Sequence, residues 1–235
     1  MLMSRSRWMV LLGATAAALG IAALVGWRAW SSSTETFRAG APPEDLAQML
    51  LPKQLDVSSL RPPAILSSDI PRYGGATATV AVIEYGDYQC PECRLQAKTI
   101  AEVLPEYNGK VRFVWKDLPL VDQHPEAVAA AAFARCAKAQ GLFWEAYDRL
   151  ISRELGARTY AAISRELGLD AAAMDACRSQ PALVGQLTRE ISAANADGIQ
   201  GVPLVFIGPK ALYGPLDAAK LRAEIAPFVE SASQP

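Results

Sequence analysis

Two closely spaced cysteines constrain this chain more than any other feature. Cys90 and Cys93 are separated by two residues and lie between a strand-like and a helix-like segment. Residues 77–85, TATVAVIEY, are rich in β-branched side chains and predict a strand, whereas residues 90–109 predict a helix. Residues 111–116, VRFVWK, predict a second strand. The pattern therefore predicts a β-α-β unit with both thiols at the turn from strand to helix.

The start of the predicted helix gives the two thiols different chemistry. Pro91 suits the first helical turn, so Cys90 lies where unpaired backbone N–H groups and the positive end of the helix dipole point. Both effects stabilise a thiolate and lower the pKa of Cys90. Cys93 follows on the same helix face, one turn further in, and we expect it to be more buried. Cys90 is therefore the predicted reactive thiol and Cys93 the predicted resolving thiol.

Three other roles for Cys90 and Cys93 compete with redox chemistry. A zinc site would need further ligands from Cys136, Cys177 or His124, and the sequence has no second C-x-x-C or H-x-H element. A copper chaperone would be expected to add histidines or methionines near the pair, and residues 77–116 contain neither. A purely structural disulfide would close an awkwardly tight loop at a helix start. We therefore predict a redox pair that uses no metal and no other cofactor.

The later segments complete the fold prediction. Residues 124–198 predict successive helices, with stops at Gly156 and Gly168. Residues 203–214 then predict a hairpin, PLVFIG followed by KALYG, and residues 217–230 predict a last helix.

The order of these elements is β-α-β, a helical block, and then β-β-α. Without the block, at about residues 117–198, this order is that of a thioredoxin fold, in the α/β class. Asp170 and Asp217 are the predicted N-caps of two of the helices. We assign residues 73–235 to this domain, and Gly109 is the predicted C-terminal cap of the helix that carries the cysteines.

The N-terminus carries the clearest signal outside this domain. Residues 8–27 contain no charged side chain, and their length matches the roughly 20 residues that span a bilayer. Arg5 and Arg7 precede this segment, which predicts a cytoplasmic N-terminus. We predict a transmembrane anchor within residues 1–30, and a long cleavable signal peptide is the alternative. Either way the later residues are exported to the periplasm or another extracytoplasmic, oxidising space, anchored to the membrane or secreted.

Residues 31–72 read as a Pro/Ser-rich linker between the membrane and the domain. They contain six prolines, which disfavour helix and favour extended chain. One apolar piece, residues 44–51, predicts a short helix that is a candidate docking element.

Composition excludes two broad classes of protein. The chain is 51% hydrophobic and 20% charged, which argues against disorder for most of its length. Its net charge is −1 and it contains no long basic run, so no nucleic-acid partner is predicted.

Three stretches, taken in order, resemble one family. They are residues 74–93, 124–150 and 201–208, and they look like the DsbA-like thiol–disulfide oxidoreductases of the thioredoxin superfamily. The resemblance covers about residues 73–230. It implies disulfide exchange with exported, cysteine-containing protein substrates, together with a membrane or periplasmic redox partner.

The resemblance also implies roles for residues beyond the cysteines. In the family a cis-proline loop faces the thiol pair and binds the substrate backbone, and the matching residue here is Pro203, preceded by Val202. The family places a buried acid under the disulfide, which matches Glu84, although strand alternation alone leaves an exposed carboxylate equally open. Lys116, at the end of the second predicted strand, is the candidate partner of Glu84. Such a pair would relay the proton of Cys93.

A second disulfide is predicted within the helical block. Cys136 and Cys177 both lie in predicted helices, and two thiols in an oxidising compartment favour a bond over two buried free thiols. Some members of the resembled family carry a second disulfide at similar positions.

Glu92 leaves the direction of electron flow open. The most strongly oxidising members of the family have a histidine at this position, and a carboxylate beside Cys90 disfavours the thiolate. We predict an oxidase, and a reductase or isomerase of exported disulfides is the alternative.

Overall fold

The computed structural model describes residues 57–66, 69–75 and 77–232. The predicted membrane segment, residues 8–27, and the predicted helix at residues 44–51 lie outside the described residues. Among the residues that are described, none of the helices is both long enough and apolar enough to cross a membrane.

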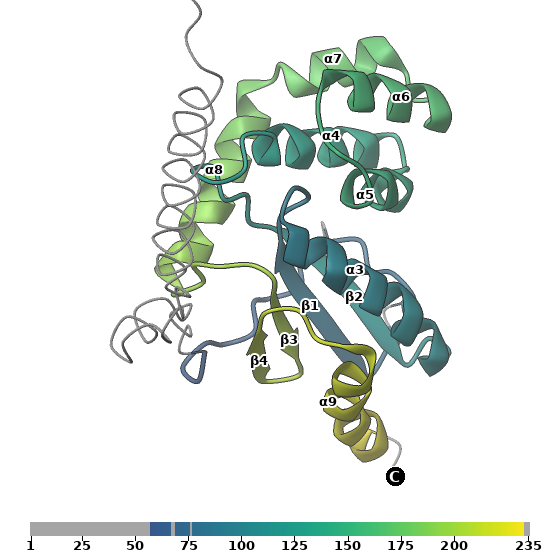
Figure 1. Ribbon diagram of the computed structural model, residues 1–235, viewed down its shortest axis with the longest axis vertical. Helices are drawn as coiled ribbons and strands as arrows, with labels where there is room; N and C mark the ends of the chain where they lie inside the picture. The colour runs from purple at the N-terminus through teal and green to yellow at the C-terminus, as the bar shows by residue number, and fades with distance from the viewer. Residues whose placement is uncertain (1–56, 67–68, 76, 233–235) are drawn as a thin grey trace, which may run out of the picture. The chain divides into compact units, whose positions relative to one another are not determined.

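The described chain alternates between a small sheet and a set of helices (Figure 1). In chain order the elements are β1 (Val80–Gly86), α3 (Pro91–Val103), the 3₁₀ helix η1 (Leu104–Tyr107), β2 (Val111–Asp117), α4 (Ala127–Ala139), α5 (Phe143–Ile151), α6 (Ala157–Leu167), α7 (Ala171–Arg178), α8 (Pro181–Ala196), β3 (Leu204–Ile207), β4 (Lys210–Tyr213) and α9 (Ala218–Ser231).

The sheet has the strand order β2-β1-β3-β4. β1 and β2 are parallel, β3 is antiparallel to β1, and β4 is antiparallel to β3. Helix α3 makes the crossover between β1 and β2 and packs against α9, which also contacts β1. The predicted β-α-β and β-β-α units are therefore confirmed as a thioredoxin-like α/β fold, and α4–α8 form the insertion between them. In Figure 1 most of the insertion lies at the end of the sheet where α3 begins, whereas α9 lies toward the other end.

Apolar side chains from the strands and from the insertion fill one continuous core. The largest fully buried ones include Phe113 and Phe206 on the strands, and Phe133, Leu150 and Ile163 in the insertion. Burying a side chain of this size contributes about 1.5–3 kcal/mol each relative to leaving it exposed.

Several helix ends are set by single residues, as the sequence predicts. Pro91 occupies the first turn of α3, where its missing N–H costs nothing. Asp170 and Asp217 cap α7 and α9, because their carboxylates accept hydrogen bonds from backbone N–H groups three residues on. Gly168 ends α6 with a φ of 64°, a conformation that only glycine adopts at little cost.

Two predicted helix ends were wrong. Gly109 does not cap α3, which ends at Val103 and continues as η1 until Asn108 turns with a φ of 48°. The reason is Pro105, which has no backbone N–H and therefore cannot donate the hydrogen bond that would continue the helix. Gly156 does not end α5, which stops at Ile151, but instead precedes α6.

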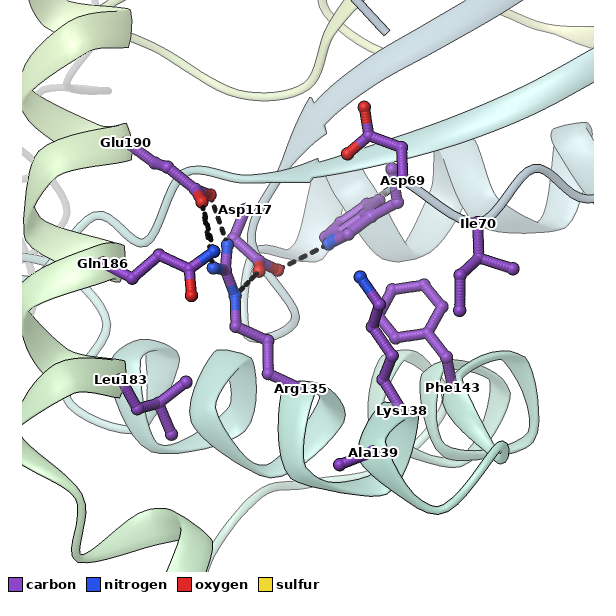
Figure 2. A pocket seen from close by; sticks show the side chains of 11 residues that line it. Asp69, Ile70, Asp117, Arg135, Lys138, Ala139, Phe143, Leu183, Gln186 and Glu190 are labelled. Carbon is purple, nitrogen blue, oxygen red and sulfur yellow. Dashed lines mark hydrogen bonds and ion pairs between the residues drawn. The ribbon is translucent and has the colours of Figure 1, made fainter. Parts of the chain in front are cut away.

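A disulfide and the ion pairs of Arg135 link helices of the insertion to one another and to β2. Cys136 on α4 and Cys177 on α7 form a disulfide with a Cα–Cα distance of 5.8 Å. Arg135 on α4 donates to Asp117 at the end of β2 (2.8 Å) and to Glu190 on α8 (2.6 Å), as Figure 2 shows. These groups lie on one wall of a cavity of about 390 Å³.

Described residues just before the predicted domain start at residue 73 contact the domain. Leu60 is buried in the core, and Arg72 exchanges two backbone hydrogen bonds with Phe113 on β2 (2.8 and 2.9 Å). The guanidinium of Arg72 also binds the carboxylate of Asp148 on α5 at 2.7 Å. The described parts of residues 57–72 therefore pack against the domain, and Arg72 pairs with Phe113 at the free edge of β2.

We expect the Cys136–Cys177 bond to stabilise the domain. The two cysteines are 41 residues apart, and closing a loop of that size typically contributes about 2–4 kcal/mol. The variant Cys177→Ala breaks the bond while keeping the fully buried Cys136 in place. Urea unfolding should show a loss of about 2–4 kcal/mol. A loss below about 0.5 kcal/mol, the scatter of ordinary surface substitutions, would contradict this expectation.

Candidate active site

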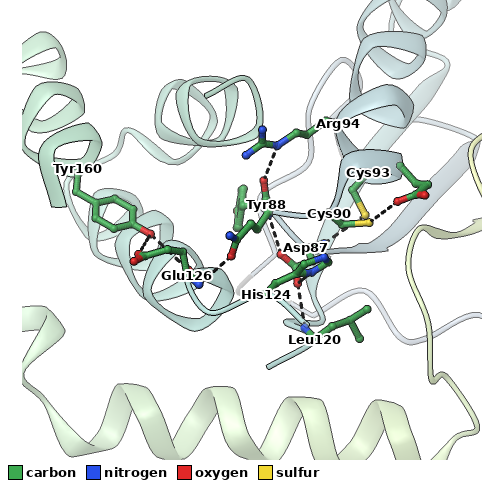
Figure 3. A network of polar contacts seen from close by, with 11 residues as sticks. Asp87, Tyr88, Cys90, Cys93, Arg94, Leu120, His124, Glu126 and Tyr160 are labelled. Atoms are coloured by element: carbon green, nitrogen blue, oxygen red, sulfur yellow. Dashed lines mark hydrogen bonds and ion pairs between the residues drawn. The ribbon is translucent and has the colours of Figure 1, made fainter. Parts of the chain in front are cut away.

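The two redox-type cysteines lie where β1 turns into α3. β1 ends at Gly86, and Cys90 is the N-cap residue of α3, with an extended backbone (φ −65°, ψ 124°). Cys93 lies one turn further on, and the backbone N–H of Asp87 donates to its Sγ at 3.5 Å (Figure 3). Both thiols are free in this structure. Cys90 is 4% exposed and Cys93 is fully buried, which is the order that the sequence predicts.

The two thiols differ in acidity. A side-chain hydrogen bond from Cys93 lowers the pKa of Cys90 and outweighs the opposing effect of burial. Burial raises the pKa of Cys93, and the hydrogen bond to Cys90 and the nearby Glu84 raise it further. The site therefore favours a thiolate on Cys90 and a protonated thiol on Cys93.

Glu92 touches the first cysteine directly. Its side chain is exposed, and its Oε2 accepts a hydrogen bond from the Cys90 thiol at 3.3 Å. This bond stabilises the protonated thiol and so raises the pKa of Cys90, against the lowering by Cys93. The net direction is still downward, so Glu92 moderates the acidity of Cys90 and does not reverse it.

Glu84 is a buried acid on β1, beneath the redox turn. It is fully buried, and neither carboxylate oxygen has a hydrogen-bond partner within the described part of the chain. Burial raises the pKa of Glu84 well above 4.5, and the nearby Cys90 raises it further. The carboxyl group therefore holds a proton at pH values where an exposed glutamate is ionised.

The predicted pairing of Lys116 with Glu84 was wrong. The Nζ of Lys116 binds Asp69, in the segment that precedes the domain, at 2.6 Å. In the parallel pair of β1 and β2, Glu84 stands opposite Trp115, whereas Lys116 stands opposite Tyr85. Because side chains alternate along a strand, Lys116 points to the other face of the sheet from Glu84.

Pro203 lies beside the redox turn. The Val202–Pro203 peptide bond is cis, and both residues are buried at the start of β3. Leu204 pairs with Tyr85 in the antiparallel register, so Pro203 comes next to Gly86 at the carboxyl end of β1. The carbonyl oxygen of Pro203 accepts a hydrogen bond from the N–H of Gly214 at 2.9 Å.

Gly86 permits the close packing under the turn. A Cβ atom at this position would lie 2.2 Å from the indole ring of Trp115, which no real contact allows. The same indole packs against the rings of Tyr88 and Tyr147, each with a centroid distance of 5.0 Å. The turn therefore rests on an aromatic cluster, and one of its members, Trp115, stands opposite the buried Glu84 in the strand register.

Two polar residues beside the cysteines were missed as site residues. Asp87 is 1% exposed, and its Oδ2 lies 2.8 Å from the Nδ1 of His124 (Figure 3). The sequence pattern predicted no role for Asp87, and it offered His124 only as a candidate metal ligand. The sequence feature that could have indicated a role is the position of Asp87, in the turn between a buried strand and the first cysteine. Across the described ranges, no three His, Cys, Asp or Glu side chains are grouped so that they could hold a metal ion.

Comparison with known proteins shows the family. A family model described as thioredoxin matches residues 67–226, which is more than half of the chain. The chain therefore belongs to the thioredoxin family, and its fold is that of the DsbA-like thiol–disulfide oxidoreductases.

Two solved structures illustrate the likeness in fold. A thioredoxin-like oxidoreductase from Silicibacter pomeroyi is 21% identical with a TM-score of 0.60, and the match covers 69% of this chain and 92% of that chain. DsbA2 from Pseudomonas aeruginosa is 22% identical with a TM-score of 0.59, and the match covers 73% of this chain and 100% of that chain.

The matched curated proteins are much longer than this chain. It is 34% identical over 164 residues to the Na(+)/H(+) antiporter NhaA 3 of Salinispora tropica, a match that covers 68% of this chain and 24% of the antiporter. The match to NhaA 1 of Salinispora arenicola is 31% identical and covers 80% of this chain and 29% of that protein. The chain thus spans about a quarter of the length of these relatives.

We expect Cys90 to react with alkylating agents before Cys93. Cys90 has the lowered pKa, and Cys93 is fully buried with a raised pKa. Brief treatment of the reduced protein with iodoacetamide near pH 7, followed by peptide mass mapping, measures the order of labelling. Dominant early labelling of Cys93 would show that the assignment of roles is reversed.

We also expect Glu84→Gln to change the pH dependence of stability. The folded pKa of Glu84 is raised, so the wild type loses stability as the pH rises from about 4.5 toward that folded pKa, whereas a glutamine does not titrate. In that window the free energy of unfolding of Glu84→Gln should rise relative to that of the wild type by up to about 1.4 kcal/mol for each pH unit. Urea unfolding across pH 4–8 measures this difference in stability. The proteins are kept oxidised, so that no thiol of Cys90 or Cys93 titrates in the same range.

The exposed residue Glu145 on α5 supplies the matched control for this experiment. Glu145→Gln also removes one carboxylate, but it removes no buried acid. A constant difference in stability between Glu84→Gln and the wild type across the pH range would contradict a raised pKa at Glu84.

Proposed function

We propose that this chain is an extracytoplasmic thiol–disulfide oxidoreductase that exchanges disulfides with exported proteins through Cys90 and Cys93, acting as an oxidase. One observation carries the proposal, namely the unequal pair of thiols at the start of α3. Cys90 has a lowered pKa, and Cys93 is buried with a raised pKa. A stable thiolate on Cys90 makes this sulfur a good leaving group and favours the reduced form, which is the property of an oxidant.

The reaction proceeds in two exchanges. A substrate thiolate attacks the Sγ of Cys90 in the oxidised protein, the Cys90–Cys93 bond breaks, and Cys93 leaves as a thiolate. Glu84 supplies a proton to Cys93, because its carboxyl group is buried and protonated. A second substrate thiolate then attacks the substrate sulfur of the mixed disulfide and releases Cys90 as a thiolate. Two substrate thiols have then become a disulfide, and the protein disulfide has become a dithiol.

Pro203, preceded by Val202, aligns the substrate chain in this proposal. The support is its position next to Gly86, which is four residues before Cys90. A substrate held there lies beside the sulfur that it attacks, and alignment of this kind lowers the entropic part of the barrier.

We also propose that a membrane or periplasmic redox partner reoxidises the dithiol, and that residues 8–27 anchor the chain or direct its export. The support is the uncharged stretch of about bilayer length behind Arg5 and Arg7. The antiporter name belongs to whole proteins of which this chain matches about a quarter, so we propose no transport role for it.

A reductase or isomerase of exported disulfides is the second candidate. The hydrogen bond from the Cys90 thiol to Glu92 favours it, because this bond opposes the thiolate and weakens the oxidant. The reduction potential of the Cys90–Cys93 couple separates the two. A reduction potential near −120 mV is that of a strong oxidase, whereas one near −270 mV is that of a reductase. A difference of about 30 mV corresponds to a tenfold change in the equilibrium constant.

Trapping tests the proposed function. The variant Cys93→Ser should accumulate mixed disulfides between Cys90 and exported proteins, because the resolving thiol is absent. The double variant Cys90→Ser, Cys93→Ser is the control and should trap nothing. Non-reducing electrophoresis followed by mass spectrometry identifies the adducts, and an absence of adducts from Cys93→Ser would count against exchange with proteins.

We expect Glu92→His to make the couple more oxidising. The substitution removes the acceptor that stabilises the Cys90 thiol and adds a group that, when protonated, stabilises the thiolate. The pKa of Cys90 should fall by on the order of one unit, because the position is exposed and screened. Titration of thiolate absorbance and equilibration with glutathione measure the two quantities. Glu102→His, further along α3, is the control, and no change in either quantity for Glu92→His would show that this position does not tune the site.

A further inference from the structure

One buried carboxylate lies between the redox turn and the helical insertion. Asp87 is the first residue after β1 and is 1% exposed. Its Oδ1 accepts a hydrogen bond from the backbone N–H of Gln89 at 2.8 Å. Its Oδ2 accepts one from the N–H of Leu120 at 2.9 Å and lies 2.8 Å from the Nδ1 of His124 (Figure 3). Both side-chain oxygens of this buried group therefore have polar partners.

These bonds join two segments that are distant in the sequence. Leu120 and His124 are 33 and 37 residues beyond Asp87, and both lie in the loop that leads from β2 into α4. A third contact links the same two segments, because the N–H of Glu126 donates to the side-chain oxygen of Gln89 at 2.8 Å. The redox turn is therefore attached to the start of the insertion through side chains.

The same residue bonds to both cysteines through its backbone. The N–H of Asp87 donates to the Sγ of Cys93 at 3.5 Å, and its carbonyl oxygen accepts from the N–H of Cys90 at 3.2 Å. The position of the Asp87 carboxylate therefore fixes the orientation of the peptide groups that meet the thiol pair. Both thiols are free in this structure, so these are contacts of the dithiol form.

We propose that Asp87, held by His124, is a positioning residue for the redox pair and stabilises the dithiol relative to the disulfide. The inference rests on the proposed function, thiol–disulfide exchange at Cys90 and Cys93. Its physical basis is the hydrogen bond to the sulfur of Cys93, which is one of the two atoms that form a new bond when the disulfide closes. Loss of the Asp87 carboxyl group or of the His124 ring frees the turn, weakens that bond and makes the pair less oxidising.

Equilibration with glutathione tests the proposal. Two glutathione molecules reduce the Cys90–Cys93 disulfide to two thiols and become glutathione disulfide. We expect Asp87→Asn and His124→Leu each to lower the equilibrium constant for this reduction about three- to tenfold, the size of one ordinary net hydrogen bond. A tenfold fall corresponds to about 30 mV. His124→Asn, whose amide nitrogen can take the place of Nδ1, should restore most of the wild-type value.

Two controls separate positioning from a purely structural role. Asp122→Asn removes an exposed carboxylate from the same loop and should leave the constant unchanged. Urea unfolding of each variant in both redox forms gives the second control. A structural role destabilises the two forms equally and does not move the constant, whereas positioning destabilises the dithiol form more.

The equilibrium constants of Asp87→Asn and His124→Leu with glutathione decide the proposal. A constant within twofold of the wild type for both Asp87→Asn and His124→Leu overturns the positioning role and leaves the proposed function intact. If Asp87→Asn does not fold, His124→Leu decides alone, because the His124 side chain is 16% exposed. A wild-type pair that does not exchange with glutathione contradicts the proposed function itself, and with it this inference.

Discussion

The pairing of the central strand β1 is the constraint on which the site depends. β1 is hydrogen-bonded to β2 on one edge and to β3 on the other, so its carboxyl end cannot shift. That register places Glu84 between Trp115 and Val205, and it brings Pro203 next to Gly86. The chain leaves β1 directly into the turn that carries the cysteines. Segments far apart in the sequence therefore deliver a thiol pair, a buried acid and a cis-proline to one end of the sheet.

The features that the sequence predicts well are those decided over short distances. Asp170 and Asp217 accept from N–H groups three residues on, and Pro91 acts through its own missing N–H, so their effect on a helix start can be read locally. The difference in burial between the two thiols follows from the same helix start, because one lies at the N-cap and the other one turn inside. The lowered pKa of Cys90 has a different main cause, which is its side-chain hydrogen bond with Cys93. The burial of Glu84 was not a local matter, and only the resemblance to a family favoured it over exposure.

The features that the sequence did not predict depend on which groups meet across the fold. Lys116 binds Asp69 instead of Glu84 because the register of two strands decides which face each side chain occupies, and a register cannot be read from either strand alone. The contact of Asp87 with His124 likewise spans 37 residues and two loops. Residues 57–72 looked like linker because their prolines disfavour regular structure, yet Arg72 pairs with β2 through its backbone alone.

The place of Lys116 changes how the proposed proton transfer works. A lysine partner would stabilise the charged form of Glu84 and lower its pKa. With Lys116 engaged on the other face, burial governs Glu84, and its pKa is raised. The pKa of Cys93 is raised as well, in part by Glu84, so the buried site resists two negative charges at once. When Cys93 leaves as a thiolate, the neutral carboxyl group of Glu84 is the nearby acid that can protonate it, which moves the single negative charge of the site from Cys93 to Glu84. The absence of the predicted ion pair therefore strengthens the case for Glu84 as the proton donor to Cys93.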